Sequence, residues 1–80
     1  MYFTYILKSE KDQKHYYGST NSIESRLIKH NKGDVKSTRY RRPFIIHYSE
    51  NFETRAEAFQ REQFFKSIDG YNWLKEHKII

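Results

Sequence analysis

The sequence predicts an α/β domain, more narrowly an α+β sandwich in which helices flank a three-stranded antiparallel β-sheet. Three short runs rich in β-forming residues predict the strands, and two segments that open with helix-capping residues predict the longer helices. The order is strand, strand, helix, strand, helix, short helix. No internal repeat, linker or low-complexity tract divides the 80 residues. We therefore expect a single domain spanning residues 1–80.

The composition predicts a compact aromatic core beneath a basic surface. Seven Tyr, six Phe and one Trp supply the apolar bulk, while 15 Lys and Arg against 10 Asp and Glu give a net charge of +5. That charge favours a polyanionic partner such as DNA or RNA. Because cysteine is absent, a disulfide framework and a cysteine nucleophile are excluded. The apolar run near Met1 is too short for a signal peptide or a membrane span, so we expect a cytoplasmic location and no membrane partner.

The first two strands are predicted at Tyr2 to Lys8 and His15 to Ser19, joined by a polar turn. As an antiparallel hairpin they bring Tyr5 and Tyr16 near each other, although the long turn leaves the register open by a residue or two. Taken alone, the two tyrosines are better explained as core residues with bonded hydroxyls than as functional groups.

A helix is predicted directly after the second strand. Asn21 suits the N-cap position, and Glu24 stands three residues later, as in a capping box. Arg26 and His30 are four residues apart and share a helix face, with Gly33 just beyond the expected end. A cation and an imidazole held side by side suit a phosphate better than a core.

The next segment, Lys32 to Pro43, is predicted to be a basic loop. Its positive residues surround one aromatic side chain, and only Asp34 opposes them. Such a loop can hold a nucleic-acid backbone and stack a base. The candidate nucleic-acid-binding residues are Lys32, Lys36, Arg39, Tyr40, Arg41 and Arg42.

The third strand is predicted from Phe44 to Ser49, with His47 as a hydrogen-bonded packing residue. The four histidines have no spacing typical of a zinc site, so we expect none. A second helix should start at a capping box between Thr54 and Glu57 and run to about Ser67. A short third helix is expected from Asp69 to Ile80.

The second helix contains a carboxylate among apolar neighbours. On a helical wheel Ala58, Phe59 and Phe65 mark one arc, and Glu62 projects from within it. A carboxylate so placed needs a cation, a donor or a metal. Lys66, one turn later, allows an ordinary Glu–Lys pair, and the helix alone does not distinguish this pair from a metal-binding role.

Taken together, these residues resemble the GIY-YIG nuclease superfamily, most of all its small members made of little more than the catalytic domain. Phe3-Thr4-Tyr5 stands where the family has Gly-Ile-Tyr, and Tyr16-Tyr17-Gly18 where it has Tyr-Ile-Gly. Arg26, His30 and Glu62 match the family's arginine, its following histidine or tyrosine, and its helix-borne glutamate in order and spacing. The resemblance covers residues 2–67 strongly and the tail loosely.

The resemblance implies hydrolysis of a phosphodiester with one divalent ion, Mg²⁺ or Mn²⁺, and gives the catalytic residues as Tyr5, Tyr16, Arg26, His30 and Glu62. Glu62 would be the metal ligand, with water and phosphate oxygens completing the shell. Arg26 would bind the non-bridging phosphate oxygens. Tyr5, helped by Tyr16 and His30, would align or deprotonate the attacking water; a phenol needs a lowered pKa for that role, and the choice between Tyr5 and His30 as the base stays open.

Three functions compete at this point. The first is a metal-dependent DNA endonuclease, for which nicked, flapped or branched DNA is the candidate preferred substrate and RNA an open alternative. The second is a nucleic-acid-binding module with the same fold and little or no catalysis, or with activity only when a protein partner supplies substrate affinity. The third is an interaction protein for another acidic partner, which predicts no salt-sensitive binding of nucleic acid.

Overall fold

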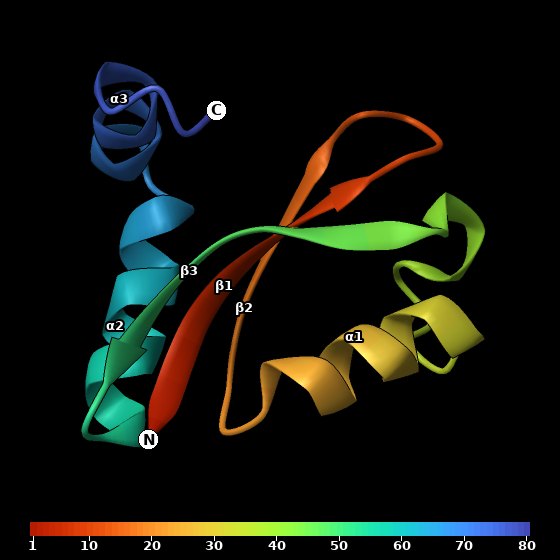
Figure 1. The fold of residues 1–80 in the computed structure, drawn as a ribbon. Coiled ribbons are helices and arrows are strands. Elements are labelled where there is room, and N and C mark those ends of the chain that lie inside the picture. The colour runs from red at the N-terminus through yellow and green to blue at the C-terminus, as the bar shows by residue number, and fades with distance from the viewer.

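The computed structural model describes all of residues 1–80, and it confirms the predicted α+β architecture (Figure 1). A three-stranded antiparallel sheet in the order β2–β1–β3 lies between α1 on one face and α2 with α3 on the other. The elements are β1 (Tyr2–Ser9), β2 (His15–Thr20), α1 (Ile23–Lys32), a 3-10 turn (Arg39–Arg41), β3 (Phe44–Phe52), α2 (Arg55–Phe65) and α3 (Ile68–Glu76).

The central strand β1 is buried on both faces from Thr4 to Leu7, and it divides the core into two parts. Because side chains alternate along a strand, Tyr5 and Leu7 point toward α1, whereas Ile6 points toward α2 and α3. The first core, under α1, also contains Phe44. The second core, under α2 and α3, also contains Phe65 from α2 and Leu74 from α3. The side chains of the edge strand β2 alternate in the same way, since Tyr16 packs against the first core and Tyr17 against the second. A site at this edge can therefore use residues from both faces of the sheet.

The helix ends follow local chemistry. The predicted capping box of α2 is confirmed, with Thr54 and Glu57 bonding each other's backbone N–H groups. Gly33 ends α1 at φ +82°, as glycine permits. The predicted cap of α1 was wrong, because Ser22 rather than Asn21 accepts from the backbone N–H of Ser25. A hydrogen bond from the Ser22 N–H to the Thr20 hydroxyl holds Ser22 in the extended conformation of an N-cap.

Three boundaries differ from the prediction. The basic segment is not a plain loop, since α1 continues through Lys32 and Arg39–Arg41 form a helical turn. β3 continues to Phe52, because its last residues pair with the start of β1. α3 ends at Glu76, after which Ile79 and Ile80 pack against the second core. No helix combines the length and the apolar character needed to cross a membrane.

One core assignment was wrong. Three residues of α2 are buried, namely Ala58, Glu62 and Phe65, whereas the exposed fraction of Phe59 is 53%. The buried residues follow the three-to-four spacing of one helix face, and Phe59 lies about 100° around the helix from Ala58. Phe59 is thus a surface aromatic residue.

Candidate active site at the edge of the sheet

The candidate site lies along β2, where residues from both faces of the sheet approach one edge. Tyr5 pairs with Gly18 across the two strands, and Thr4 pairs with Ser19. Tyr16 and Gly18 belong to the face covered by α1, whereas Tyr17 and Ser19 belong to the face covered by α2. The predicted register was open at this point; the structure places Tyr16 opposite Leu7, two residues from the Tyr5 pair and on the same face.

The sequence-predicted residues Tyr5, Tyr16 and His30 come together on the α1 side. The His30 ring centroid lies 4.8 Å from that of Tyr16 and 6.5 Å from that of Tyr5. His30 is fully buried near the end of α1, and Phe44 closes the cluster at 5.7 Å. Buried aromatic rings at these distances hold one another in fixed orientations.

One ring nitrogen of His30 is hydrogen-bonded and the other is not. Nδ1 lies 2.8 Å from the Thr38 hydroxyl. Nε2 is buried and has no hydrogen-bond partner. His30 thus has one unpaired ring nitrogen beside two tyrosines.

Burial, followed by the positive charge of Arg26, lowers the pKa of His30 from 6.5 to about 4. His30 is consequently neutral at physiological pH. The same burial raises the pKa of the Tyr5 phenol, and the neighbouring Arg26 only opposes that rise. The sequence-based expectation that nearby cations lower the phenol pKa is therefore not met by the protein's own groups.

The stability of the protein should fall as pH decreases from 6.5 toward about 4, in part through His30. In this window the unfolded chain protonates this imidazole and the folded chain does not, so protons favour unfolding and the contribution is complete only above pH 6.5. Urea unfolding curves across the window should show a steeper loss of stability for the natural protein than for His30→Asn. Parallel losses would contradict a buried neutral His30. The comparison with the variant removes the contribution of His15, whose pKa burial also lowers.

Arg26 reaches the same edge from α1. Its guanidinium has no carboxylate partner, because the three ion pairs of the structure are formed by Arg41, Arg61 and Lys66. Its Nε is buried without a hydrogen bond. A guanidinium so held is ready to bind an anion from outside the chain, and a phosphate fits its planar donors.

Glu62 lies on the α2 side and completes the set. One carboxylate oxygen accepts from the Ser19 hydroxyl at 2.8 Å, and the other accepts from Lys66 Nζ at 2.7 Å. Glu62 is 9% exposed, and it is near enough to influence the pKa of Tyr5 and of Arg26. The structure therefore provides two of the partners that the sequence suggested for this carboxylate, a hydrogen-bond donor (Ser19) and a cation (Lys66). Both partners are compatible with a metal-binding role.

The donor set fits a divalent ion shared with a substrate rather than one enclosed by the protein. No group of three or more His, Cys, Asp and Glu residues could hold a metal. Each Glu62 oxygen has one protein donor and keeps a second lone pair. Mg²⁺ is typically held by one or two carboxylates, with water and substrate phosphate oxygens as its other ligands. Glu62 alone would hold such an ion.

Gly18 makes room for the Tyr5 side chain. A Cβ atom at position 18 would lie 2.5 Å from Tyr5 Cζ and closer still to the Tyr5 hydroxyl. Tyr5 is 1% exposed and packed on all sides, so its ring cannot move aside freely. The absence of a side chain at Gly18 thus fixes where the phenol sits at the edge of the sheet.

Gly18→Ala should therefore destabilise the protein by about 1–3 kcal/mol, although alanine is otherwise the better strand residue. The matched background is Tyr5→Leu, which removes the clashing atoms; there the same Gly18→Ala change should be neutral or stabilising. Chemical denaturation of the four proteins measures the coupling. Equal effects of Gly18→Ala in both backgrounds would mean that Tyr5 does not depend on Gly18.

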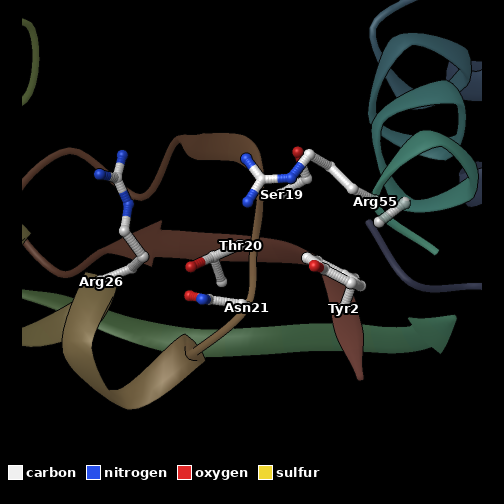
Figure 2. A pocket seen from close by; sticks show the side chains of 7 residues that line it. Tyr2, Ser19, Thr20, Asn21, Arg26 and Arg55 are labelled. Atoms are coloured by element: carbon white, nitrogen blue, oxygen red, sulfur yellow. The ribbon is translucent and has the colours of Figure 1, made fainter. Parts of the chain in front are cut away.

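A polar cavity of about 340 Å³ opens beside this cluster (Figure 2). Arg26 and Arg55 flank it from different helices, with Thr20 and Asn21 between them in the view. The full lining is Tyr2, Ser19, Thr20, Asn21, Arg26, Arg55 and Ala58. Of the predicted catalytic residues only Arg26 lines this cavity. Arg55 was missed by sequence reasoning, because nothing in its own helix distinguishes it from a solvated arginine.

The predicted nucleic-acid-binding residues lie elsewhere and are partly engaged with the protein. Arg41 pairs with Asp12 at 2.8 Å, Arg39 donates to the Gly33 carbonyl, and Arg42 donates to the Arg39 carbonyl. Five of the six residues are exposed, all except Arg41. The segment packs at the Ser9 end of β1, through the hydrogen bond from the Ser9 hydroxyl to the Arg41 carbonyl. The cavity lies toward the Tyr2 end of the strand.

Comparisons with known proteins find similarity over most of the chain. The GIY-YIG catalytic domain matches residues 1–72. A UPF0213 protein of Bacillus licheniformis is 44% identical over 72 residues, which cover 89% of this chain and 73% of that protein. A UPF0213 protein of Staphylococcus saprophyticus is 41% identical over 75 residues, or 92% of this chain and 90% of that protein. The solution NMR structure of a UPF0213 protein from Bacillus halodurans is similar with a TM-score of 0.56 and 32% identity, covering 98% of this chain and 86% of that one.

Proposed function

This chain belongs to the GIY-YIG catalytic-domain family, and on that premise we propose that it is a metal-dependent endonuclease that hydrolyses DNA phosphodiester bonds. The observation that carries the proposal is the meeting of three groups at the β2 edge. Arg26 has no carboxylate partner, the Tyr5 phenol lies over Gly18, and Glu62 is a nearly buried carboxylate. A phosphate binder, a group to align water and a metal ligand are what phosphodiester hydrolysis requires.

In this proposal the chain's own groups act as follows. Arg26 binds the non-bridging oxygens of the scissile phosphate and stabilises the charge that develops on them in the transition state. The Tyr5 hydroxyl orients the attacking water, and Tyr16 and His30 hold the phenol in place. His30 is a weak base because its pKa is about 4, so its role in this proposal is to position the tyrosine pair rather than to take up a proton.

Glu62 would hold the divalent ion, Mg²⁺ or Mn²⁺. The bound ion would supply stabilisation of the leaving oxygen and of the phosphate charge. Ser19 keeps the carboxylate oriented through its hydrogen bond, and Lys66 contacts the other oxygen through the ion pair.

The basic segment is proposed as a second contact with the nucleic-acid backbone. Its exposed cations extend from the last residue of α1 to the Ser9 end of β1, beyond Arg26, so an extended duplex could contact both. Phosphate contacts of this kind add affinity without sequence specificity. Because such contacts do not read the base sequence, we expect the protein to select DNA by its structure, such as a nick, a flap or a branch. A protein partner is a further source of specificity.

A nucleic-acid-binding module without catalysis is the second candidate, and the Lys66–Glu62 pair favours it. That pair neutralises the single carboxylate of the site in the free protein. A module of this kind would bind DNA equally well in chelator and in Mg²⁺.

The test is cleavage of labelled duplex, single-stranded, nicked, flapped and four-way-junction DNA, with matching RNA, in Mg²⁺, in Mn²⁺ and in chelator. We expect cutting only with the metals and mainly on the interrupted DNA substrates. Salt-sensitive binding without cutting under every condition would overturn the nuclease and leave the binding module. Absence of both would overturn every nucleic-acid function.

A further inference from the structure

We propose that the groove between β2 and the first two turns of α2 binds one unpaired nucleotide beside the scissile phosphate, with Arg55 on its phosphate and Phe59 on its base. This inference rests on the proposed nuclease function and names the substrate feature that the site selects. It assigns two residues, Arg55 and Phe59, that the GIY-YIG resemblance does not include.

The groove is formed by two adjoining hollows. The polar cavity of about 340 Å³ contains Arg26 and Arg55, and a second hollow of about 470 Å³ is lined by Ser19, Arg55, Ala56 and Phe59. Ser19 and Arg55 line both, so the two hollows are neighbours. One end therefore offers a guanidinium at the proposed scissile phosphate, and the other offers an apolar wall. Each hollow has the size of a small-molecule site, about 300–1,000 Å³.

Arg55 is the second free cation of this groove. It is exposed, takes part in none of the three ion pairs, and its guanidinium lies over the Tyr2 ring at 5.4 Å from the centroid. The stacked ring limits the positions that the guanidinium can take, while its N–H donors stay available. Two guanidiniums on opposite sides of one cavity favour a ligand with more than one phosphate, such as a polynucleotide strand.

Phe59 supplies the apolar wall. It lies one helical turn after Arg55, so the two side chains share a face of α2 with about 5–6 Å between their Cβ atoms. Other exposed apolar side chains, such as Tyr40 at 78% and Ile68 at 81%, line neither hollow. A phenyl ring next to a free guanidinium matches a nucleotide, which carries a phosphate at one end and an aromatic base at the other.

The base must be unpaired. In a duplex each base is stacked on its neighbours and bonded to its partner, so its face is not available to Phe59. A flap, a gap or a frayed end presents that face without the cost of unstacking. The groove would thus direct cleavage toward a phosphate next to an interruption of the duplex.

Binding in chelator tests this inference separately from catalysis. The ligand is a fluorescently labelled flapped duplex, compared with the same DNA carrying an abasic site at the unpaired position, and affinities are measured by anisotropy. Removing the base should weaken binding to the natural protein about fivefold or more, but should change binding to Phe59→Ala very little. Phe59→Tyr should restore the sensitivity, and Ile68→Ala, an exposed apolar residue outside the groove, should behave as the natural protein.

Arg55 is tested by the salt dependence of the same binding. Arg55→Ala should lower the slope of log affinity against log salt by about 0.7, the value for one contact to a single-stranded phosphate. Lys75→Ala, an exposed cation on α3, should leave the slope unchanged.

The outcomes separate this inference from the proposed function. If base removal weakens binding to the natural protein and to Phe59→Ala equally, the groove does not hold the base and the inference is wrong, while metal-dependent cleavage can still stand. If the natural protein neither binds nor cuts DNA, the inference and the proposed function are both wrong.

Discussion

Replacing Glu62 by glutamine is expected to abolish metal-dependent DNA cleavage, lowering the rate by about 10³-fold or more, while the fold remains intact. A bound divalent ion contributes several kcal/mol of transition-state stabilisation, and a neutral amide is a poor ligand for Mg²⁺. The amide oxygen can still accept the Ser19 hydroxyl, so the geometry of the site is preserved. Rates should be measured on the preferred DNA over a range of Mg²⁺ and Mn²⁺ concentrations.

The expected loss of cleavage by Glu62→Gln would not result from unfolding of the protein. The pair between Glu62 and Lys66 is an i,i+4 contact with a half-exposed lysine, and its removal should cost less than about 1 kcal/mol. Glu76→Gln is a matched control, because it removes an exposed carboxylate from α3 that takes part in no ion pair. Its cleavage rate should equal that of the natural protein.

Lys66→Met distinguishes the two interpretations of Glu62 that the sequence leaves open. If Glu62 binds the metal, removal of the competing ammonium frees one carboxylate oxygen, and half-maximal cleavage should need less metal. If Glu62 serves only to pair with Lys66, both variants should cut DNA like the natural protein and differ from it only in stability. That second result would remove the metal-ligand assignment.

Local sequence rules predicted the elements because each element carries its own signals. Three runs of β-forming residues, the Thr54 capping box and Gly33 at the end of α1 act over a few residues, and the structure contains each of them. The Asn21 cap failed where two good capping residues stand together and a tertiary detail, the Thr20 hydroxyl, decides between them.

The arrangement of the candidate site was less predictable, since it depends on register and on contacts between distant segments. Gly18 could be expected to permit a close approach, but only the pairing with Tyr5 shows that the phenol occupies the space. Phe59 fitted an apolar arc on the helical wheel because it lies about 60° from Glu62, at the edge of the buried face. Which edge of that arc meets the sheet is a tertiary property, and it leaves Phe59 exposed.

The cavity was even harder to predict from the sequence than the tyrosine–histidine cluster. Tyr2, Ser19, Arg26 and Arg55 come from four elements, and no spacing along the chain relates them. Arg26 was found because a family motif marks its position, whereas Arg55 carries no such mark. A free arginine becomes notable only when its neighbours are seen to include a second guanidinium and no carboxylate.

Arg26→Ala is expected to lower the turnover number by about 10²–10³-fold with little change in the Michaelis constant. The Nε of Arg26 is buried, its side chain lines the cavity, and no carboxylate pairs with it. We therefore expect Arg26 to bind the phosphate more strongly in the transition state, when negative charge develops on its oxygens, than in the ground state. Single-turnover cleavage with enzyme in excess measures the chemical step directly.

Two comparisons decide whether this effect is specific. Lys29→Ala removes one positive charge from the same helix at an exposed position, so it reports the effect of net charge alone and should reduce the rate only slightly. Arg26→Lys keeps the charge but not the planar pair of donors, and it should recover little of the lost rate. If Arg26→Ala and Lys29→Ala slow cleavage equally, Arg26 contributes only to general attraction of the DNA, and the phosphate must be bound by another group, of which Arg55 is the nearest candidate in the same cavity.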